Sequence, residues 1–241
     1  MDQAPRAGNT VARTLAFGGG LAFVASLVYF LYSYVDRFGP AAGSGSGSAW
    51  RPALIDLGLL AAFGLHHSAF ARLGLKRWIE GRVTPAGERS VYVWVSSALF
   101  VAVCVAWQPV PGDWWTAAPA ARPLFYALQV VGIIISVRSA SRLDVLELAG
   151  IRQVLGGARR APELLRSGAY GLVRHPVYLG WLLIIWWTPV MTGTRLVFAA
   201  ATTIYLIVAI PLEERDLMRT FGATYEEYRR RVRWRMIPFV F

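Results

Sequence analysis

Arg174-His175-Pro176-Val177-Tyr178-Leu179-Gly180 puts polar side chains at the start of a very apolar segment. Pro176 suits the first turn of a helix, where its missing N–H would have no partner, so we expect a helix to begin there. Arg174 and Tyr178 are four positions apart, and His175 and Tyr178 are three apart. In a helical turn all three can therefore face one ligand, which predicts a polar site at a membrane boundary.

The composition indicates an integral membrane protein. Of the 241 residues, 56% are hydrophobic, which is too apolar for a soluble domain of this length. The net charge of +11 could suggest nucleic acid, but the basic residues lie between apolar segments and not on one soluble face. We therefore expect a lipid bilayer as partner and no nucleic acid. The single cysteine, Cys104, excludes an internal disulfide and a thiolate metal cluster.

Six apolar segments predict an all-α, polytopic membrane helix bundle of about six transmembrane helices. A short turn, Thr192–Arg195, joins the last two and forces an antiparallel hairpin. An amphipathic cytoplasmic helix is expected to follow from about Glu213 to Arg233. The six segments are Thr14 to about Val35, Leu54–Ala71, about Ser90–Trp107, Leu124–Val137, Val177 to about Met191, and Leu196–Leu212.

The distribution of basic residues predicts the orientation. With the N-terminus in the cytoplasm, the segments 1–13, 72–89, 138–174 and 213–241 hold 21 of the 25 basic residues. Cytoplasmic loops of membrane proteins are enriched in Lys and Arg. We therefore expect both termini, the Gly-rich connector 138–173 and the C-terminal helix on the cytoplasmic side of the membrane.

Glu213 and Glu214 lie where the last apolar segment leaves the bilayer. On the expected helix, Glu214 falls near the middle of an apolar stripe, and Glu213 lies on its flank. A carboxylate on a buried stripe is costly unless it is paired with a cation, which could be Arg174, Arg152 or a positive group on a ligand. The hairpin returns Glu213 to the membrane face of Tyr178, so the two motifs can share a pocket. The stripe consists of Leu217, Phe221, Tyr225, Tyr228 and Val232.

Other motifs exclude several classes of site. His66 and His67 are adjacent, so on a helix their side chains point about 100° apart, and we expect no metal site. The sequence contains no phosphate-binding Gly-rich loop after a strand, no P-loop and no nucleophile elbow. These absences argue against a kinase, an NTPase or a soluble dinucleotide-binding protein.

At these motifs the sequence resembles the isoprenylcysteine carboxyl methyltransferase superfamily of integral membrane methyltransferases. The resemblance rests on Ser167–Gly180, Glu213-Glu214 and Phe221–Tyr228. It implies that S-adenosylmethionine binds at the cytoplasmic face. A sulfonium and an ammonium group need carboxylate or aromatic partners, and the carboxylate of the ligand needs Arg or backbone N–H groups. The implied cofactor-binding residues are Gly168, Tyr170, Arg174, His175, Tyr178, Leu179, Gly180, Glu213 and Glu214.

Most of the chain looks similar to the methanethiol S-methyltransferase branch, which methylates a small thiol to dimethyl sulfide. His67–Arg72, Pro85–Tyr92 and Gly150–Val154 carry this likeness, although Val145 and Glu147 depart from the expected His and Asp. The likeness implies that residues 1–137 form a four-helix region on the substrate side and residues 138–241 bind the methyl donor. A small thiol must lose its proton, so the expected catalytic residues are His67 or Glu88 as base, directly or through water, with Arg89 and Arg152 stabilising the thiolate.

Three alternatives remain open at this point. The acceptor could be a carboxyl group or a lipid, as in other members of the superfamily. Membrane sterol reductases, which use NADPH, share an Arg-His-Pro-x-Tyr element and an Ile-Pro ending, but Val177 replaces the expected Asn and Glu213-Glu214 fits methyl transfer better. A non-enzymatic membrane protein linked to denitrification is the third. The abundance of Arg and Ala suggests a bacterial source and hence the inner membrane, and no feature of the sequence sets an oligomeric state.

Overall fold

The computed structural model describes residues 5–39, 47–70, 85–143, 151–155 and 163–241. Within them, five helical stretches are long and apolar enough to cross a membrane, which confirms the expected all-α membrane bundle. The polar loop before Pro85, most of the linker 41–48, and Val145 and Glu147 lie outside the described residues. The five stretches are Thr10–Arg37, Trp50–Phe70, Arg89–Ala106, Pro119–Ala140 and Gly193–Phe221.

The fifth apolar segment of the sequence is shorter than expected. Helix α9 covers Pro176–Trp186, and its 11 residues extend about 16 Å, roughly half of the hydrocarbon core. The segment was expected to remain helical to about Met191. It does not, because Thr188 precedes Pro189, and the residue before a proline is disfavoured in the helical conformation. The expected six spans are thus five long helices and one short one.

The first compact unit contains α1 (Pro5–Tyr32), which continues as the π-helical turn η1 (Ser33–Arg37), most of α3 (Trp50–Phe70), α5 (Pro85–Ala106) and the short α8 (Ile151–Val154). Helices α1 and α5 pack where Gly18 lies against Trp94, whose ring would be 2.9 Å from a Cβ at that glycine. The Trp94 indole Nε1 donates to the Leu15 carbonyl at 2.9 Å. A glycine in α1 therefore makes room for a large side chain of α5.

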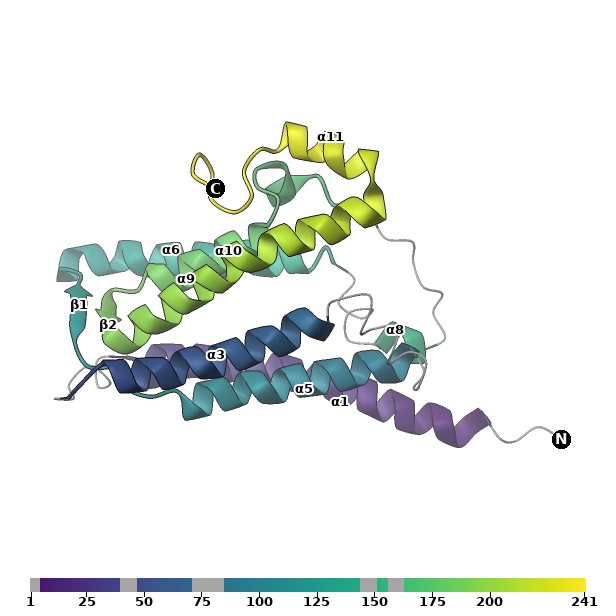
Figure 1. Cartoon of the computed structure of the whole chain (residues 1–241), viewed down its shortest axis with the longest axis horizontal. Coiled ribbons are helices and arrows are strands. Elements are labelled where there is room, and N and C mark those ends of the chain that lie inside the picture. The colour runs from purple at the N-terminus through teal and green to yellow at the C-terminus, as the bar shows by residue number, and fades with distance from the viewer. Residues whose placement is uncertain (1–4, 40–46, 71–84, 144–150, 156–162) are drawn as a thin grey trace. The chain divides into compact units, whose positions relative to one another are not determined.

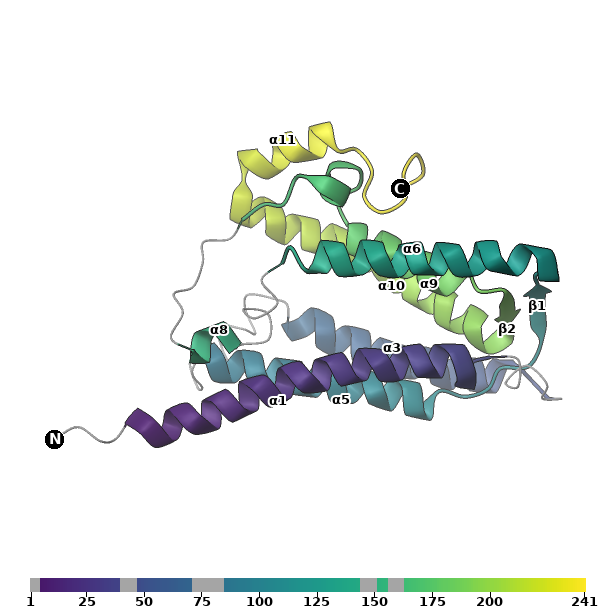
Figure 2. The ribbon, with the colours of Figure 1, turned by 180° about the vertical axis from the view of Figure 1, so that it is seen from behind.

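The second unit contains β1 (Asp113–Thr116), the 3₁₀ turn η2 (Pro119–Ala121), α6 (Arg122–Ala140), the 3₁₀ turn η3 (Gly168–Gly171), α9, β2 (Val190–Thr192), α10 (Gly193–Phe221) and α11 (Ala223–Arg231). Strands β1 and β2 pair antiparallel. Helices α9 and α10 form the expected hairpin, and Trp186 Nε1 donates to Thr203 Oγ1 across it at 2.9 Å. Figures 1 and 2 show α6, α9 and α10 in this unit.

Helix α6 packs on α9 through small residues. A Cβ on Gly180 would overlap Ser136 Oγ, and a Cβ on Gly132 would lie 2.6 Å from the Gly180 carbonyl oxygen. Close backbone approach at small residues is a common way for helices to associate in membranes. Helix α6 thus packs with the C-terminal elements, whereas the expected division into residues 1–137 and 138–241 places it with the N-terminal helices. The assignment of the substrate to the first region and of the methyl donor to the second stays a prediction.

The C-terminal helix is broken, so the prediction of one continuous helix over Glu213–Arg233 is wrong. Gly222 has a φ of +53°, a conformation that glycine adopts far more readily than other residues. Helix α10 therefore ends at Phe221, and α11 turns back over its end (Figures 1 and 2). The apolar stripe survives the break, because Tyr225, Tyr228 and Val232 are buried against side chains at the end of α10.

We expect Gly132→Ala and Gly180→Ala each to lower the thermal unfolding midpoint in detergent, since overpacking typically costs about 1–3 kcal/mol. The matched control is Gly58→Ala in α3, where an added Cβ meets no atom within 4 Å. This control should unfold at the same temperature as the original chain or slightly higher, because Ala favours helix over Gly. Equal midpoints for Gly132→Ala and Gly58→Ala would contradict the close packing of α6 on α9.

Candidate functional site

The N-terminus of α9 is fixed by the C-terminal tail. The helix begins at Pro176, as expected, and His175 is its N-cap residue. The two residues before Pro176 are held by backbone hydrogen bonds: Arg174 N–H donates to the Trp234 carbonyl at 2.9 Å, and His175 N–H donates to the Arg235 carbonyl at 2.8 Å. The side chains of this turn are therefore placed by a segment about sixty residues away in the sequence.

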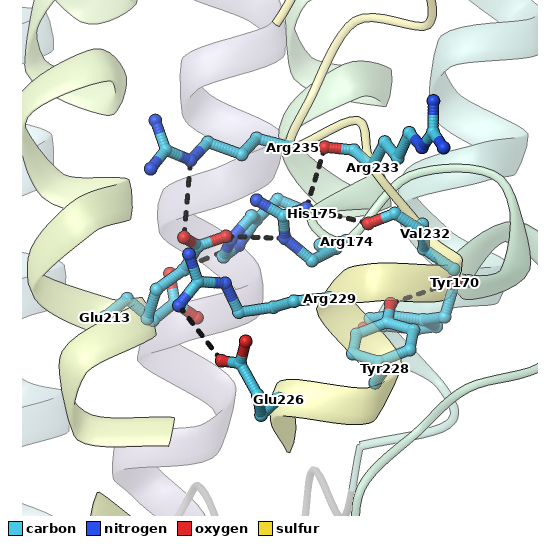
Figure 3. A network of polar contacts seen from close by, with 11 residues as sticks. Tyr170, Arg174, His175, Glu213, Glu226, Tyr228, Arg229, Val232, Arg233 and Arg235 are labelled. Carbon is cyan, nitrogen blue, oxygen red and sulfur yellow. Dashed lines mark hydrogen bonds and ion pairs between the residues drawn. The ribbon is translucent and has the colours of Figure 1, made fainter. Parts of the chain in front are cut away.

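A buried ion pair joins this turn to α10. Arg174 Nε donates to Glu214 Oε1 at 2.7 Å, and the two side chains are 6% and 4% exposed (Figure 3). The same guanidinium donates through Nη1 to the carbonyl groups of Val232 at 2.7 Å and Arg233 at 2.8 Å. Of the cations considered for the stripe carboxylate, Arg174 is thus the partner within the protein.

Arg235 is a second partner of Glu214 that the sequence analysis missed. Its Nε donates to Glu214 Oε2 at 3.3 Å (Figure 3). Arg235 lies in the tail after α11, in a cluster of basic residues with no periodicity to single it out. The only signal in the sequence was the need of a buried carboxylate for positive charge.

The neighbouring carboxylate is differently placed. The Tyr178 hydroxyl donates to Glu213 Oε2 at 3.0 Å, and His175 Nδ1 lies 3.5 Å from the same oxygen. The His175 ring stacks on Tyr178 with centroids 5.5 Å apart and planes 5° apart. The Glu213 side chain is 45% exposed, whereas that of Glu214 is 4% exposed. A cationic ligand can therefore reach Glu213, with two aromatic rings beside it.

Tyrosines close the side of the site next to α11. The Tyr228 hydroxyl donates to the Tyr170 carbonyl at 2.7 Å (Figure 3). Burial raises the pKa of Tyr170, Tyr225 and Tyr228, and nearby glutamates raise it further. These phenols stay neutral at physiological pH, with Tyr170 and Tyr228 donating hydrogen bonds to carbonyl groups and Tyr225 acting as a buried packing group.

The remaining residues expected in the donor site lie in a turn or in the packing of α9. Gly168 has a φ of +67° at the start of η3, and Arg142 holds this turn through hydrogen bonds to Ser167 at 3.0 Å. Gly180 lies at the contact of α9 with α6. Leu179 is half-buried in the first turns of α9. The structure brings Tyr170, Arg174, His175, Tyr178, Glu213 and Glu214 together in one unit.

The expected catalytic residues lie in the first unit. His67 Nδ1 is 2.8 Å from the Tyr92 hydroxyl, and the Arg89 guanidinium lies over the Tyr92 ring at 5.2 Å. The sequence analysis did not single out Tyr92, although its spacing of three from Arg89 on α5 put both on one helix face. Arg152 is half-buried in α8, and the side chain of Glu88 lies outside the described residues.

Nowhere in the described part of the chain do three or more His, Cys, Asp or Glu side chains gather in a way that could hold a metal ion. His66 instead packs against aromatic rings: its ring centroid lies 4.5 Å from that of Phe70 and 6.2 Å from that of Tyr92.

Known proteins resemble this chain over most of its length. Residues 150–241 match the model of the Ergosterol biosynthesis ERG4/ERG24 family. The chain is 41% identical to methanethiol S-methyltransferase of Crocosphaera subtropica over 192 residues, which cover 78% of this chain and 75% of that protein. It is 36% identical to methanethiol S-methyltransferase of Mycobacterium tuberculosis over 223 residues, 90% of this chain and 88% of the other.

A eukaryotic protein is also related. Nurim of Sus scrofa is 31% identical over 229 residues, which cover 84% of this chain and 85% of nurim. No solved structure matches the chain. Because the bacterial relatives exceed 30% identity over more than two thirds of their length, the chain belongs to the family of membrane proteins that contains the methanethiol S-methyltransferases.

Proposed function

We propose that this protein is a membrane methyltransferase that transfers a methyl group from S-adenosylmethionine to methanethiol and so produces dimethyl sulfide. The observation that carries the proposal is the identity of 32–41% to proteins named methanethiol S-methyltransferase. The site in the second unit supports it, because a half-exposed carboxylate beside two aromatic rings suits a ligand that carries positive charge.

Glu213, Tyr178 and His175 are the residues that would hold the positively charged part of the donor. The exposed carboxylate of Glu213 attracts a sulfonium or ammonium group, and the Tyr178 ring lies beside it with the buried His175 ring stacked on Tyr178. When bound, S-adenosylmethionine supplies an electrophilic methyl group on a positively charged sulfur. Glu214 has a different role: it holds Arg174 in place and so positions the turn before α9.

His67 is the proposed base for the thiol, because the thiolate is the nucleophile in sulfur alkylation and a neutral thiol reacts poorly. In this role His67 Nδ1–H donates to the Tyr92 oxygen, which leaves Nε2 to accept the proton of the thiol. Tyr92 then holds the orientation of the ring. Arg89, over the Tyr92 ring, and Arg152 are the proposed cations near the thiolate.

The protein is proposed to lie in the bacterial inner membrane with both termini in the cytoplasm. Five long apolar helices and bacterial relatives support the membrane location. The bias of 21 among 25 basic residues supports the orientation. S-adenosylmethionine is a soluble, charged molecule, so a donor site on the cytoplasmic side could be filled directly from solution.

A first experiment is calorimetric titration of S-adenosylmethionine into the detergent-solubilised protein and its Glu213→Gln variant. We expect the variant to bind about ten- to a hundredfold more weakly, because it loses a charge-assisted contact, with an unchanged unfolding midpoint. Glu227→Gln, at a side chain 64% exposed on α11, is the matched control and should bind normally. Normal binding by Glu213→Gln would remove Glu213 from the donor site. No binding by the folded original chain would reject S-adenosylmethionine and make NADPH the next ligand to titrate.

Glu214→Gln should behave differently from Glu213→Gln. It leaves the Arg174 guanidinium buried without its counter-charge, which typically costs about 3–5 kcal/mol. We therefore expect a marked fall of the thermal unfolding midpoint together with any loss of binding. If Glu214→Gln lost binding at an unchanged midpoint, Glu214 would be a direct ligand of the donor and not a positioning residue.

The role of His67 can be tested by measuring dimethyl sulfide with gas chromatography over a range of pH. We expect His67→Ala to lower turnover of methanethiol by about 10²–10⁴ near neutral pH and to leave S-adenosylmethionine binding intact. The residual rate should rise with pH, since only thiol that is already ionised can then react. His66→Ala is the comparison, and Tyr92→Phe should show a smaller loss. Unchanged turnover of His67→Ala at every pH would exclude it as the base.

A further inference from the structure

A pocket rich in arginine lies between α11 and the C-terminal tail. Its volume is about 500 Å³, and five of its lining residues are Arg174, Arg229, Arg230, Arg233 and Arg235. The lining residues also include one carboxylate, Glu226. The proposed methyl transfer uses neither Arg229, Arg230 nor Arg233, so this concentration of charge calls for a separate explanation.

The positive charge of the pocket exceeds the negative charge around it. Glu226 lies 3.7 Å from Arg229 and 3.6 Å from Arg230, so a single carboxylate is shared by two cations. Arg174 and Arg235 likewise share Glu214 behind the pocket. Five guanidinium groups thus face two side-chain carboxylates, and the positive charge predominates. Clustered guanidinium groups of this kind suit a phosphate group, whose oxygens accept bidentate hydrogen bonds.

The wall that carries Arg233 and Arg235 is held in place by the backbone. The carbonyl groups of Val232 and Arg233 accept from the Arg174 guanidinium (Figure 3). The carbonyl groups of Trp234 and Arg235 accept from the N–H groups of residues 174 and 175. A ligand would therefore find this part of the pocket already ordered, which lowers the entropic cost of binding.

Apolar groups lie beside these arginines. Trp234, Val240 and Phe241 also line the pocket, and the Arg235 guanidinium lies 5.2 Å from the centre of the Phe241 ring. Phe239 and Val240 are 83% and 74% exposed, a large exposure for adjacent apolar side chains. Basic residues next to exposed apolar ones are typical of surfaces that bind the headgroup region of an acidic membrane.

The pocket lies at a point in the chain where the protein is expected to meet the headgroup region of the membrane. Helix α10 has 29 residues and extends about 43 Å, more than the roughly 30 Å of a hydrocarbon core. Its last turns therefore reach the headgroup region, and α11 turns back from that end (Figure 1). The pocket follows directly after the end of a membrane-spanning helix, where lipid phosphate groups are abundant.

We propose that this pocket binds the phosphate group of an acidic phospholipid, with Phe239 and Val240 inserted at the boundary between headgroups and acyl chains. Arg229, Arg230 and Arg233 contact the phosphate group. Arg235 of the tail and Arg174 also bond to Glu214, which is adjacent to Glu213 of the proposed donor site. A bound lipid therefore holds the tail in its position behind that site.

The test measures the thermal unfolding midpoint of the full chain in a neutral detergent, with added phosphatidylglycerol, phosphatidylcholine or inorganic phosphate. A ligand that binds the folded state raises the midpoint. We expect phosphatidylglycerol to raise it at concentrations where phosphatidylcholine and inorganic phosphate do not.

The triple variant Arg229→Gln, Arg230→Gln, Arg233→Gln should need about a hundredfold more phosphatidylglycerol for the same rise. Each arginine that is removed near an acidic surface lowers the affinity for the lipid by about tenfold or less.

The matched control is Arg215→Gln, Arg219→Gln, Arg231→Gln, which removes the same charge from exposed positions at the same end of the chain but outside the pocket lining. It should respond like the original chain. An equal loss of response in both triple variants would mean non-specific attraction and overturn the proposal. A rise with inorganic phosphate equal to that with phosphatidylglycerol would assign the pocket to a soluble phosphate compound, and no rise with any of the three would leave it without a phosphate ligand.

Discussion

The ion pair between Arg174 and Glu214 joins three segments of the chain at one buried point. Arg174 precedes α9, Glu214 lies near the end of α10, and the same guanidinium binds two carbonyl groups of the C-terminal tail. A buried ion pair adds little net stability compared with apolar packing, since both charges lose their hydration. Its effect here is positional: with Glu214 buried, the tail and both helices are held in the one arrangement that keeps it paired.

That arrangement separates the functions of two adjacent glutamates. Consecutive residues on a helix point about 100° apart, so Glu214 enters the protein while Glu213 remains half-exposed beside Tyr178. The Glu214 carboxylate is paired with Arg174 and Arg235, whereas the Glu213 carboxylate can still attract a cation. The proposed donor site depends on this difference, because a carboxylate already neutralised by two guanidinium groups offers little to a sulfonium.

The N-terminal turn of α9 lies beside the last third of α10, where Arg174 pairs with Glu214. Helix α9 itself extends only about half the thickness of a hydrocarbon core, and the extended residues between Trp186 and Gly193, which include β2, supply the remaining length of the hairpin. The small residues Gly132 and Gly180 then let α6 approach closely enough to support α9. The tight packing behind α9 holds His175 and Tyr178 on a rigid element, as a site for a small ligand requires.

The sequence alone predicts every feature that follows from local composition or helical period. These features are the hydrophobic segments of spanning length, the helix start at Pro176, the hairpin and the burial of Glu214. The break at Gly222 could not, since a glycine within a helical pattern is compatible with either outcome until packing selects one. The partners Arg235 and Tyr92 were not singled out either, because several cations and hydroxyl groups in the sequence could equally have paired with Glu214 and His67. Local sequence patterns reveal helical periodicity and the free-energy cost of burying a charge. The choice among several possible partners is made by long-range packing.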